Sequence, residues 1–129
     1  NFNADITEKV VGNFSDNFTV SAGGTFTVDV NQGSVVLGGL TTSVVTWDFT
    51  NVSGANSKAT TVTLINRSGI GYTYGDAVNV NGAPVASGVR WVGGNPPPST
   101  ANDDILTFSI IRDGTGVTRV YCSSSINII

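Results

Sequence analysis

Short runs of alternating apolar and polar residues, separated by glycine-rich turns, constrain the fold of this chain most strongly. In the clearest run, residues 45–50, Val45, Trp47 and Phe49 alternate with threonine or aspartate. A period of two is typical of a strand that buries one face. We therefore expect Trp47 to lie in the core between two sheets.

The same pattern predicts eight to ten short strands and one all-β domain over residues 1–129. Gly23-Gly24 is expected to join the first two strands as a hairpin, because glycine tolerates the positive φ angles of tight turns. The many Gly- and Pro-rich turns favour an antiparallel β-sandwich, jelly-roll-like in topology. Residues 1–12 are expected to be irregular or to form a short helix. The expected strands are 18–22, 26–30, 34–37, 45–50, 60–65, 76–80, 89–92, 105–111, 117–122 and 126–129.

Charged side chains are sparse. They make up 12% of the residues, and the net charge is −3. The basic residues form no stripe that could follow successive phosphates, so nucleic-acid binding has little support. A surface rich in Thr, Ser, Asn and Gly suits a particle or extracellular surface that meets sugars or neighbouring copies. The six basic residues are Lys9, Lys58, Arg67, Arg90, Arg112 and Arg119.

The absence of histidine argues against most enzymes. It removes the commonest general base and the usual nitrogen ligand of zinc, and a single cysteine does not replace either. Cys122 has no partner for an intrachain disulfide and is expected to be a small core side chain. No apolar run approaches the ~20 residues that span a bilayer. We expect no catalytic site, cofactor, metal or membrane insertion.

Asp103 and Asp104 form the only adjacent carboxylate pair. Consecutive strand residues point to opposite faces, so these two acids are not expected to converge as a glycosidase pair does. Turn hydrogen bonds at the start of a strand are the better interpretation.

Two other features suggest contacts with ligands or neighbours. Tyr72 and Tyr74 are two residues apart in a glycine-flanked loop, and could face a ligand or pack in the core or at a subunit interface. The apolar C-terminal stretch predicts an edge strand that needs a cover, which a neighbouring subunit would supply. Its apolar residues are Ile126, Ile128 and Ile129.

The segment from Val89 to Tyr121 carries the most specific motif. It resembles a C-terminal module of phage tail-fibre and related virion proteins, notably of marine and cyanobacterial phages. The module runs W-P-G-G-x-x-P, a polar stretch, D-[VI]-[LF]-T-F, a D-G hairpin and W-Y-G. The matching stretches here are RWVGGNPPP at 90–98, DILTF at 104–108, DGT at 113–115 and Tyr121, with EKV at 8–10, TFTVDV at 25–30 and WDFTNV at 47–52 upstream.

The chain departs from the module at three positions: Val92, Val120 and Cys122 stand where it has Pro, Trp and Gly. No catalytic residue belongs to the motif, so an architectural role is expected. Trp91 would then end a strand and pack against the Pro96–Pro98 spacer, while two glycines allow a reversal. The motif residues are Trp91, Gly93, Gly94, Pro97, Asp104, Phe108 and Tyr121.

The resemblance implies a non-enzymatic virion protein, a tail-fibre or head-fibre module at the particle surface. Such fibres generally assemble as trimers and can contact the host envelope, including its glycans. Two alternatives stay open from the sequence. One is a capsid decoration protein or filament subunit that self-assembles, and the other is a carbohydrate-binding module using Tyr72 and Tyr74.

Overall fold

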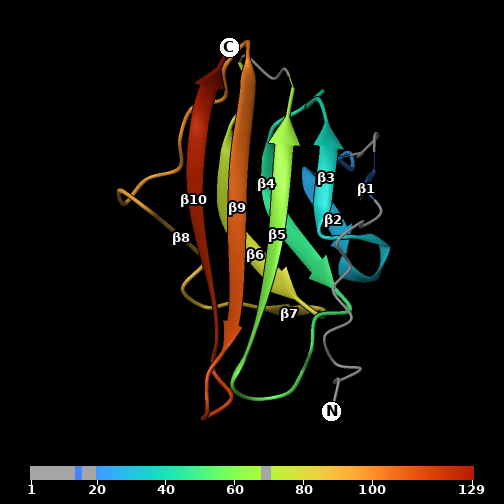
Figure 1. Cartoon of the computed structure of the whole chain (residues 1–129), viewed down its shortest axis with the longest axis vertical. Coiled ribbons are helices and arrows are strands. Elements are labelled where there is room, and N and C mark those ends of the chain that lie inside the picture. The colour runs from blue at the N-terminus through green and yellow to red at the C-terminus, as the bar shows by residue number, and fades with distance from the viewer. Residues whose placement is uncertain (1–13, 16–19, 68–70) are drawn as a thin grey trace, which may run out of the picture.

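The computed structural model describes residues 14–15, 20–67 and 71–129. That part of the chain forms ten strands and one short 3₁₀ helix, η2 (Figure 1). The segment expected to be helical or irregular, residues 1–12, lies outside the described residues. The elements are β1 (Phe14–Ser15), β2 (Thr25–Asp29), η2 (Val30–Gln32), β3 (Val35–Gly38), β4 (Val44–Thr50), β5 (Lys58–Asn66), β6 (Tyr74–Val80), β7 (Ala83–Pro84), β8 (Val89–Trp91), β9 (Asp103–Arg112) and β10 (Thr118–Ile128).

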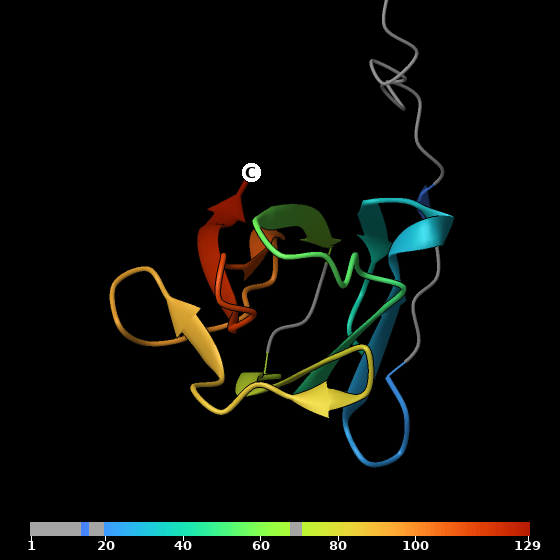
Figure 2. The ribbon, with the colours of Figure 1, turned by 90° about the horizontal axis from the view of Figure 1, so that it is seen from below.

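The strands form two sheets that face each other across the core (Figure 2). One sheet has the order β1-β3-β5-β9-β10-β8, and the other has the order β2-β4-β6-β7. The expectation of an all-β chain with two sheets is therefore confirmed.

The expected antiparallel jelly roll is wrong, because most of the pairings are parallel. Among the described residues, β1–β3, β3–β5, β2–β4, β4–β6 and β8–β10 are parallel pairs, and three pairs are antiparallel. From β2 to β6 the chain alternates between the sheets, so each strand returns beside the strand before last and in the same direction. A strand of the opposite sheet thus provides the crossover that a parallel pair needs. This part coils in the manner of a β-solenoid, and β9 and β10 then add an antiparallel pair.

Two expected local features also differ. The hairpin around Gly23-Gly24 is reduced to a single antiparallel bridge between Val20 and Phe26, because β2 pairs with β4 instead. The stretches 117–122 and 126–129 are not separate strands. They belong largely to one strand, β10, with a bulge between Ser125 and Ile128.

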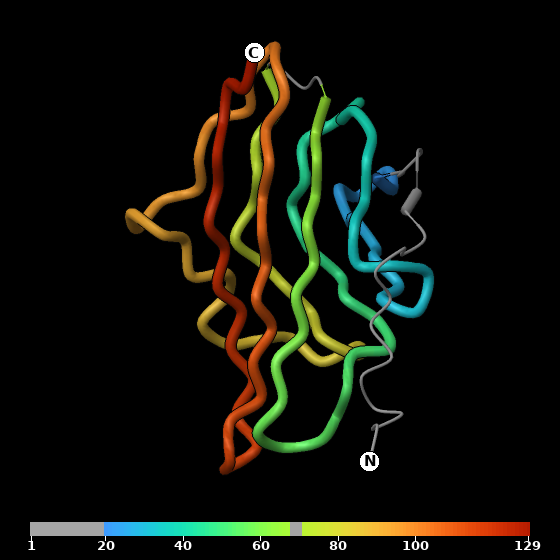
Figure 3. The backbone as a smooth tube through the Cα atoms, in the orientation of Figure 1, coloured from blue at the N-terminus to red at the C-terminus, as the bar shows by residue number. Residues whose placement is uncertain are grey.

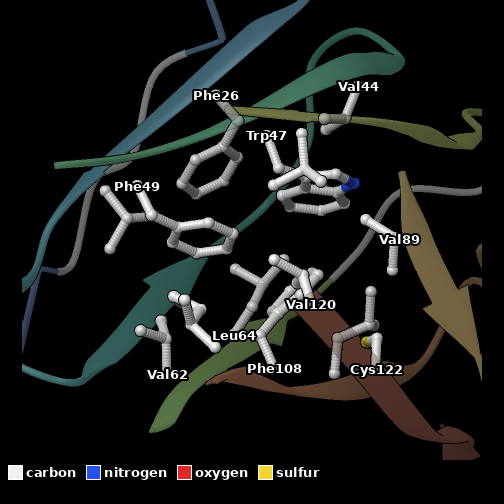
Figure 4. Packing of buried hydrophobic residues seen from close by; sticks show 14 of the residues in the cluster. Phe26, Val44, Trp47, Phe49, Val62, Leu64, Val89, Phe108, Val120 and Cys122 are labelled. Carbon is white, nitrogen blue, oxygen red and sulfur yellow. The ribbon is translucent and has the colours of Figure 1, made fainter. Parts of the chain in front are cut away.

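Aromatic rings fill the centre of the core (Figure 4). Trp47 is 1% exposed, which confirms its predicted burial. Its ring centroid lies 4.7 Å from that of Phe108, and Phe49 lies 5.2 Å from the same ring. Phe26 tilts against Trp47 from β2 at 5.6 Å. Tilted contacts of this kind stabilise a core beyond the area that they bury.

A register shift between β4 and β6 changes the expected inward parity. Val44 is buried and Val45 is 56% exposed, although the alternation placed Val45 beside Trp47 on the inner face. The pairing of β4 with β6 shifts register between Val44 and Thr46, so the residues before the shift change faces. Gly75 lies in β6 at this shift, between the register partners of Val44 and Thr46. A Cβ there would stand 2.5 Å from the Val45 carbonyl oxygen, so only glycine fits.

Candidate functional site

A network of hydrogen-bonded polar groups lies at the end of the molecule where β5 and β10 end and β6 and β9 begin. The Asp104 side chain, which is fully buried, accepts hydrogen bonds from the Tyr74 hydroxyl at 3.0 Å and from the Asn127 amide at 3.0 Å. Thr100 donates twice, from its amide at 2.8 Å and from its hydroxyl at 2.6 Å. The carboxylate therefore has four donors and no cation among these partners.

The chain of bonds continues to β5 and to the β3–β4 connection. The Asn66 side-chain amide donates to the Tyr74 oxygen at 2.8 Å, and the Asn66 carbonyl accepts from the Leu40 amide at 3.0 Å. No buried side-chain N or O atom within the described residues lacks a hydrogen-bond partner. We call this region the closed end, defined by Leu40, Asn66, Tyr74, Thr100, Asp104 and Asn127.

Burial and hydrogen bonding act in opposite directions on the Asp104 carboxyl. Burial raises its pKa, but the hydrogen bonds from Thr100, Asn127 and Tyr74 outweigh it, so the pKa lies below its ordinary value of 3.8. The pKa of Tyr74 is raised, mainly by burial and also by the nearby carboxylate. Asp104 is thus an ionised acceptor and Tyr74 a neutral donor. Their hydrogen bond stabilises the fold.

The two adjacent acids face opposite ways, as expected. Asp104 points inward and Asp103 is exposed, so they do not converge on one reacting atom. Tyr74 is 2% exposed and Tyr72 is half-buried against the core. Of the two roles that the sequence leaves open for Tyr72 and Tyr74, a ligand platform and packing, the structure favours packing, because the inward parity of β6 takes Tyr74 into the core.

Trp91 ends β8 and sits at the corner before the Gly-Gly turn. Its ring meets Phe108 edge-on at 6.3 Å, and its Nε1 donates to the Asp76 carboxylate at 2.6 Å. Gly93 and Gly94 have φ angles of 91° and 89°, and the Gly94 amide donates to the Trp91 carbonyl at 2.9 Å. The predicted strand end and reversal are confirmed.

The proline spacer leads away from the corner. Pro97 is half-buried, and Pro98 forms a single bridge with Thr73. The connection from β8 to β9 stands away from the body of the molecule (Figure 3). Its far end attaches beside β6 through this bridge. The packing of Trp91 against Pro96–Pro98 stays a prediction.

The remaining motif residues divide between core and surface. Phe108 is 1% exposed, whereas Tyr121 lies on the outer face of β10 and is 39% exposed. Cys122 is buried, as expected, and burial raises the pKa of its thiol to about 12. A thiol of this kind is a poor nucleophile at neutral pH.

The outer edge of β10 is only partly covered. The short strand β8 pairs with residues 120–122 alone, so beyond Cys122 this edge has no partner strand within the described residues. Ile126 is half-buried, Ile128 is 40% exposed, and Ile129 is fully exposed. Exposed strand edges with apolar residues favour pairing with another chain.

The opposite end of the molecule gathers cations that sequence reasoning left scattered. A cavity of about 570 Å³ there is lined by four of the six basic residues. Register explains the grouping: Lys58 on β5 and Thr118 on β10 both pair with Arg112 on β9. No sequence motif signals it, because the spacing becomes meaningful only once the pairing is known. We call this region the basic end, defined by Lys58, Arg90, Arg112 and Arg119.

No metal site or membrane helix emerges from the described residues. They contain no group of three or more His, Cys, Asp or Glu side chains that could hold a metal ion. They also contain no helix with the length and apolarity needed to cross a bilayer. No protein-family model matches the chain, and comparisons with curated proteins and with solved structures find no match.

Proposed function

We propose that this chain is a non-enzymatic structural module of a phage virion, of tail-fibre or head-fibre type, displayed at the particle surface. The virion assignment rests on the motif between Val89 and Tyr121. Trp91, Asp104 and Phe108 of that motif support an architectural role, since each packs or bonds within the fold. Side chains with catalytic potential are likewise engaged: Asp104 by four donors and Cys122 by burial.

The observation that carries an assembly role is the uncovered edge of β10. The Val92 amide donates to the Cys122 carbonyl, so the backbone groups of Cys122 point outward, toward β8. Because these groups alternate along a strand, those of Ser124 also point outward, where the described residues place no partner strand. A strand of a neighbouring copy would complete the sheet there. Closed pairing would give a trimer, and pairing that does not close would give the filament or coat subunit of the alternative proposal.

The test is the solution mass at micromolar concentration, measured by light scattering. We expect an oligomer, with a trimer favoured. Ser124→Pro removes the outward N–H and should shift the mass to that of a monomer, whereas Ser124→Ala retains the N–H and the oligomer. Deleting residues 126–129 should also weaken assembly. A strictly monomeric wild-type protein would contradict the proposal.

A further inference from the structure

The cavity at the basic end combines a positive rim with an apolar floor. Thr60 and Ile110, which are register partners on the inner face, line the cavity, and Ile110 is buried. Lys58 precedes Thr60 by two residues and Arg112 follows Ile110 by two residues. Both therefore share that inner face and lie nearer the end of the sheet. Val52 and Val80, both buried, line the same cavity.

The cations of this cavity are largely uncompensated. The single ion pair among the described residues joins Arg119 to Asp113 at 2.6 Å. Arg112 donates from Nε to the neutral Asn56 carbonyl at 3.0 Å, which neutralises no charge. The side chains of Lys58 and Arg90 make no hydrogen bond or ion pair within the described part of the chain.

No carboxylate appears among the described residues that line the cavity. Four of the six cations line this cavity, and three of them, Lys58, Arg90 and Arg112, have no acidic partner, so in a chain with a net charge of −3 they produce a local positive potential that attracts anions. The volume of about 570 Å³ falls in the range of small-molecule sites.

A second hollow adjoins the cavity. It has a volume of about 510 Å³, and its lining includes Arg90, Trp91, Val92 and Tyr121. Arg90 lines both spaces, so a ligand could extend from one to the other. Tyr121, which lines the second hollow, is 39% exposed and offers a flat apolar ring face. No aromatic residue of the described chain lines the basic cavity.

We propose that these two hollows form one binding site for an anionic oligosaccharide. A carboxylate or sulfate group would bind in the cavity against Lys58, Arg112 and Arg90, and a neighbouring sugar ring would lie against Tyr121. Charge-assisted hydrogen bonds from guanidinium and ammonium groups provide the anion contacts. The site lies within one chain, so ligand binding and oligomerisation are measured separately. A failure of the binding proposal would leave the assembly proposal standing, and the reverse also holds.

The experiment is isothermal titration of the full chain with four probes. They are a uronate tetrasaccharide, a sulfated heparin tetrasaccharide, neutral maltotetraose and inorganic sulfate. We expect at least one acidic tetrasaccharide to bind, with affinity that falls as salt rises, and maltotetraose to give no heat. The stronger acidic probe identifies whether carboxylate or sulfate is the preferred group. Binding of sulfate alone, or equal binding of maltotetraose, would overturn the proposal.

Four variants locate the site. Lys58→Gln and Arg90→Gln remove charges that have no internal partner, and each should weaken binding about tenfold. Tyr121→Ala should weaken the acidic tetrasaccharide. Arg67→Gln makes the same charge change at an exposed residue outside both hollows and should leave the affinity unchanged. If Arg67→Gln weakens binding as much as Lys58→Gln, the attraction is nonspecific and the site is wrong.

Discussion

The two ends of the molecule treat polar side chains in opposite ways. At the closed end, Asp104 is buried without a cation and is satisfied by hydroxyl and amide donors. At the basic end, the side chains of Lys58 and Arg90 are exposed around a cavity and have no hydrogen-bond or ion-pair partner within the described chain. The closed end therefore holds strands together, and the basic end leaves its charges available. Both ends arise from the same alternating strands, so the difference lies in which side chains the register brings together.

The largest effect should come from removing the acceptor of the closed end. Asp104→Ala leaves the donors of Tyr74, Thr100 and Asn127 without an acceptor, and should lower the free energy of unfolding by about 3 kcal/mol or more. Urea unfolding followed by tryptophan fluorescence measures it. Asp103→Ala is the matched control: the residue is adjacent and exposed, and its replacement should change stability by less than about 0.5 kcal/mol. Equal effects of the two changes would show that the closed end does not hold the fold together.

Two glycine substitutions test the difference between the two ends through backbone packing. Gly75→Ala places a Cβ against the carbonyl oxygens of Val44 and Val45, and should cost about 1–3 kcal/mol. At the other end of the molecule, Gly114→Ala would meet only the Ser57 hydroxyl at 3.6 Å, an ordinary contact. We expect thermal unfolding to show a clear loss for the first variant and little change for the second. A tolerated Gly75→Ala would mean that the backbone can relax where the register of β4 and β6 shifts.

The sequence predicted the strands and much of the core but not the pairing. Alternation identifies Trp47 and Phe49 as inward residues, because a half-buried strand has the same period in any sheet. It does not distinguish a parallel from an antiparallel neighbour, so the coil from β2 to β6 was missed. It also fails where the register between two strands shifts, which is why the alternation places Val45 on the wrong face.

The candidate sites show the same limit. The architectural motif was visible because Trp91, Gly93 and Gly94 are contiguous in the chain. The basic end was not, since Lys58 and Arg112 are far apart in sequence and meet only as register partners. From the sequence alone, Tyr74 could bind a ligand or pack in the core or at a subunit interface. The structure places it in the core, where its hydroxyl bonds to Asp104, which lies 30 residues away in the sequence.

The pH dependence of stability provides a third way to distinguish the closed end from the basic end. The folded-state pKa of Asp104 lies below its ordinary value, so the unfolded chain binds the proton more readily. Its contribution to stability is present above about pH 4 and is lost as the pH falls through the folded-state pKa. Urea midpoints between about pH 5 and 3 should fall less steeply in Asp104→Asn than in the wild type. Asp103→Asn should retain the wild-type slope, and a flattened slope in that control would contradict the assignment to Asp104.

The smallest effect is expected at the basic end. The double variant Lys58→Gln/Arg90→Gln removes two exposed charges with no internal partner, so the free energy of unfolding should change by less than about 0.5 kcal/mol. Thermal unfolding at low and at high salt measures this. A loss of several degrees at both salt concentrations would show that these cations stabilise the fold.

Amide hydrogen exchange tests the division between the two ends most directly. The amides of Leu40, Thr100 and Asn127 each donate to a side chain of the closed end. We predict that all three are protected in the wild type and lose protection together in Asp104→Asn. In Lys58→Gln/Arg90→Gln they should exchange at the wild-type rate. The account would be contradicted if Asp104→Asn left the three amides protected, or if the double variant exposed them equally.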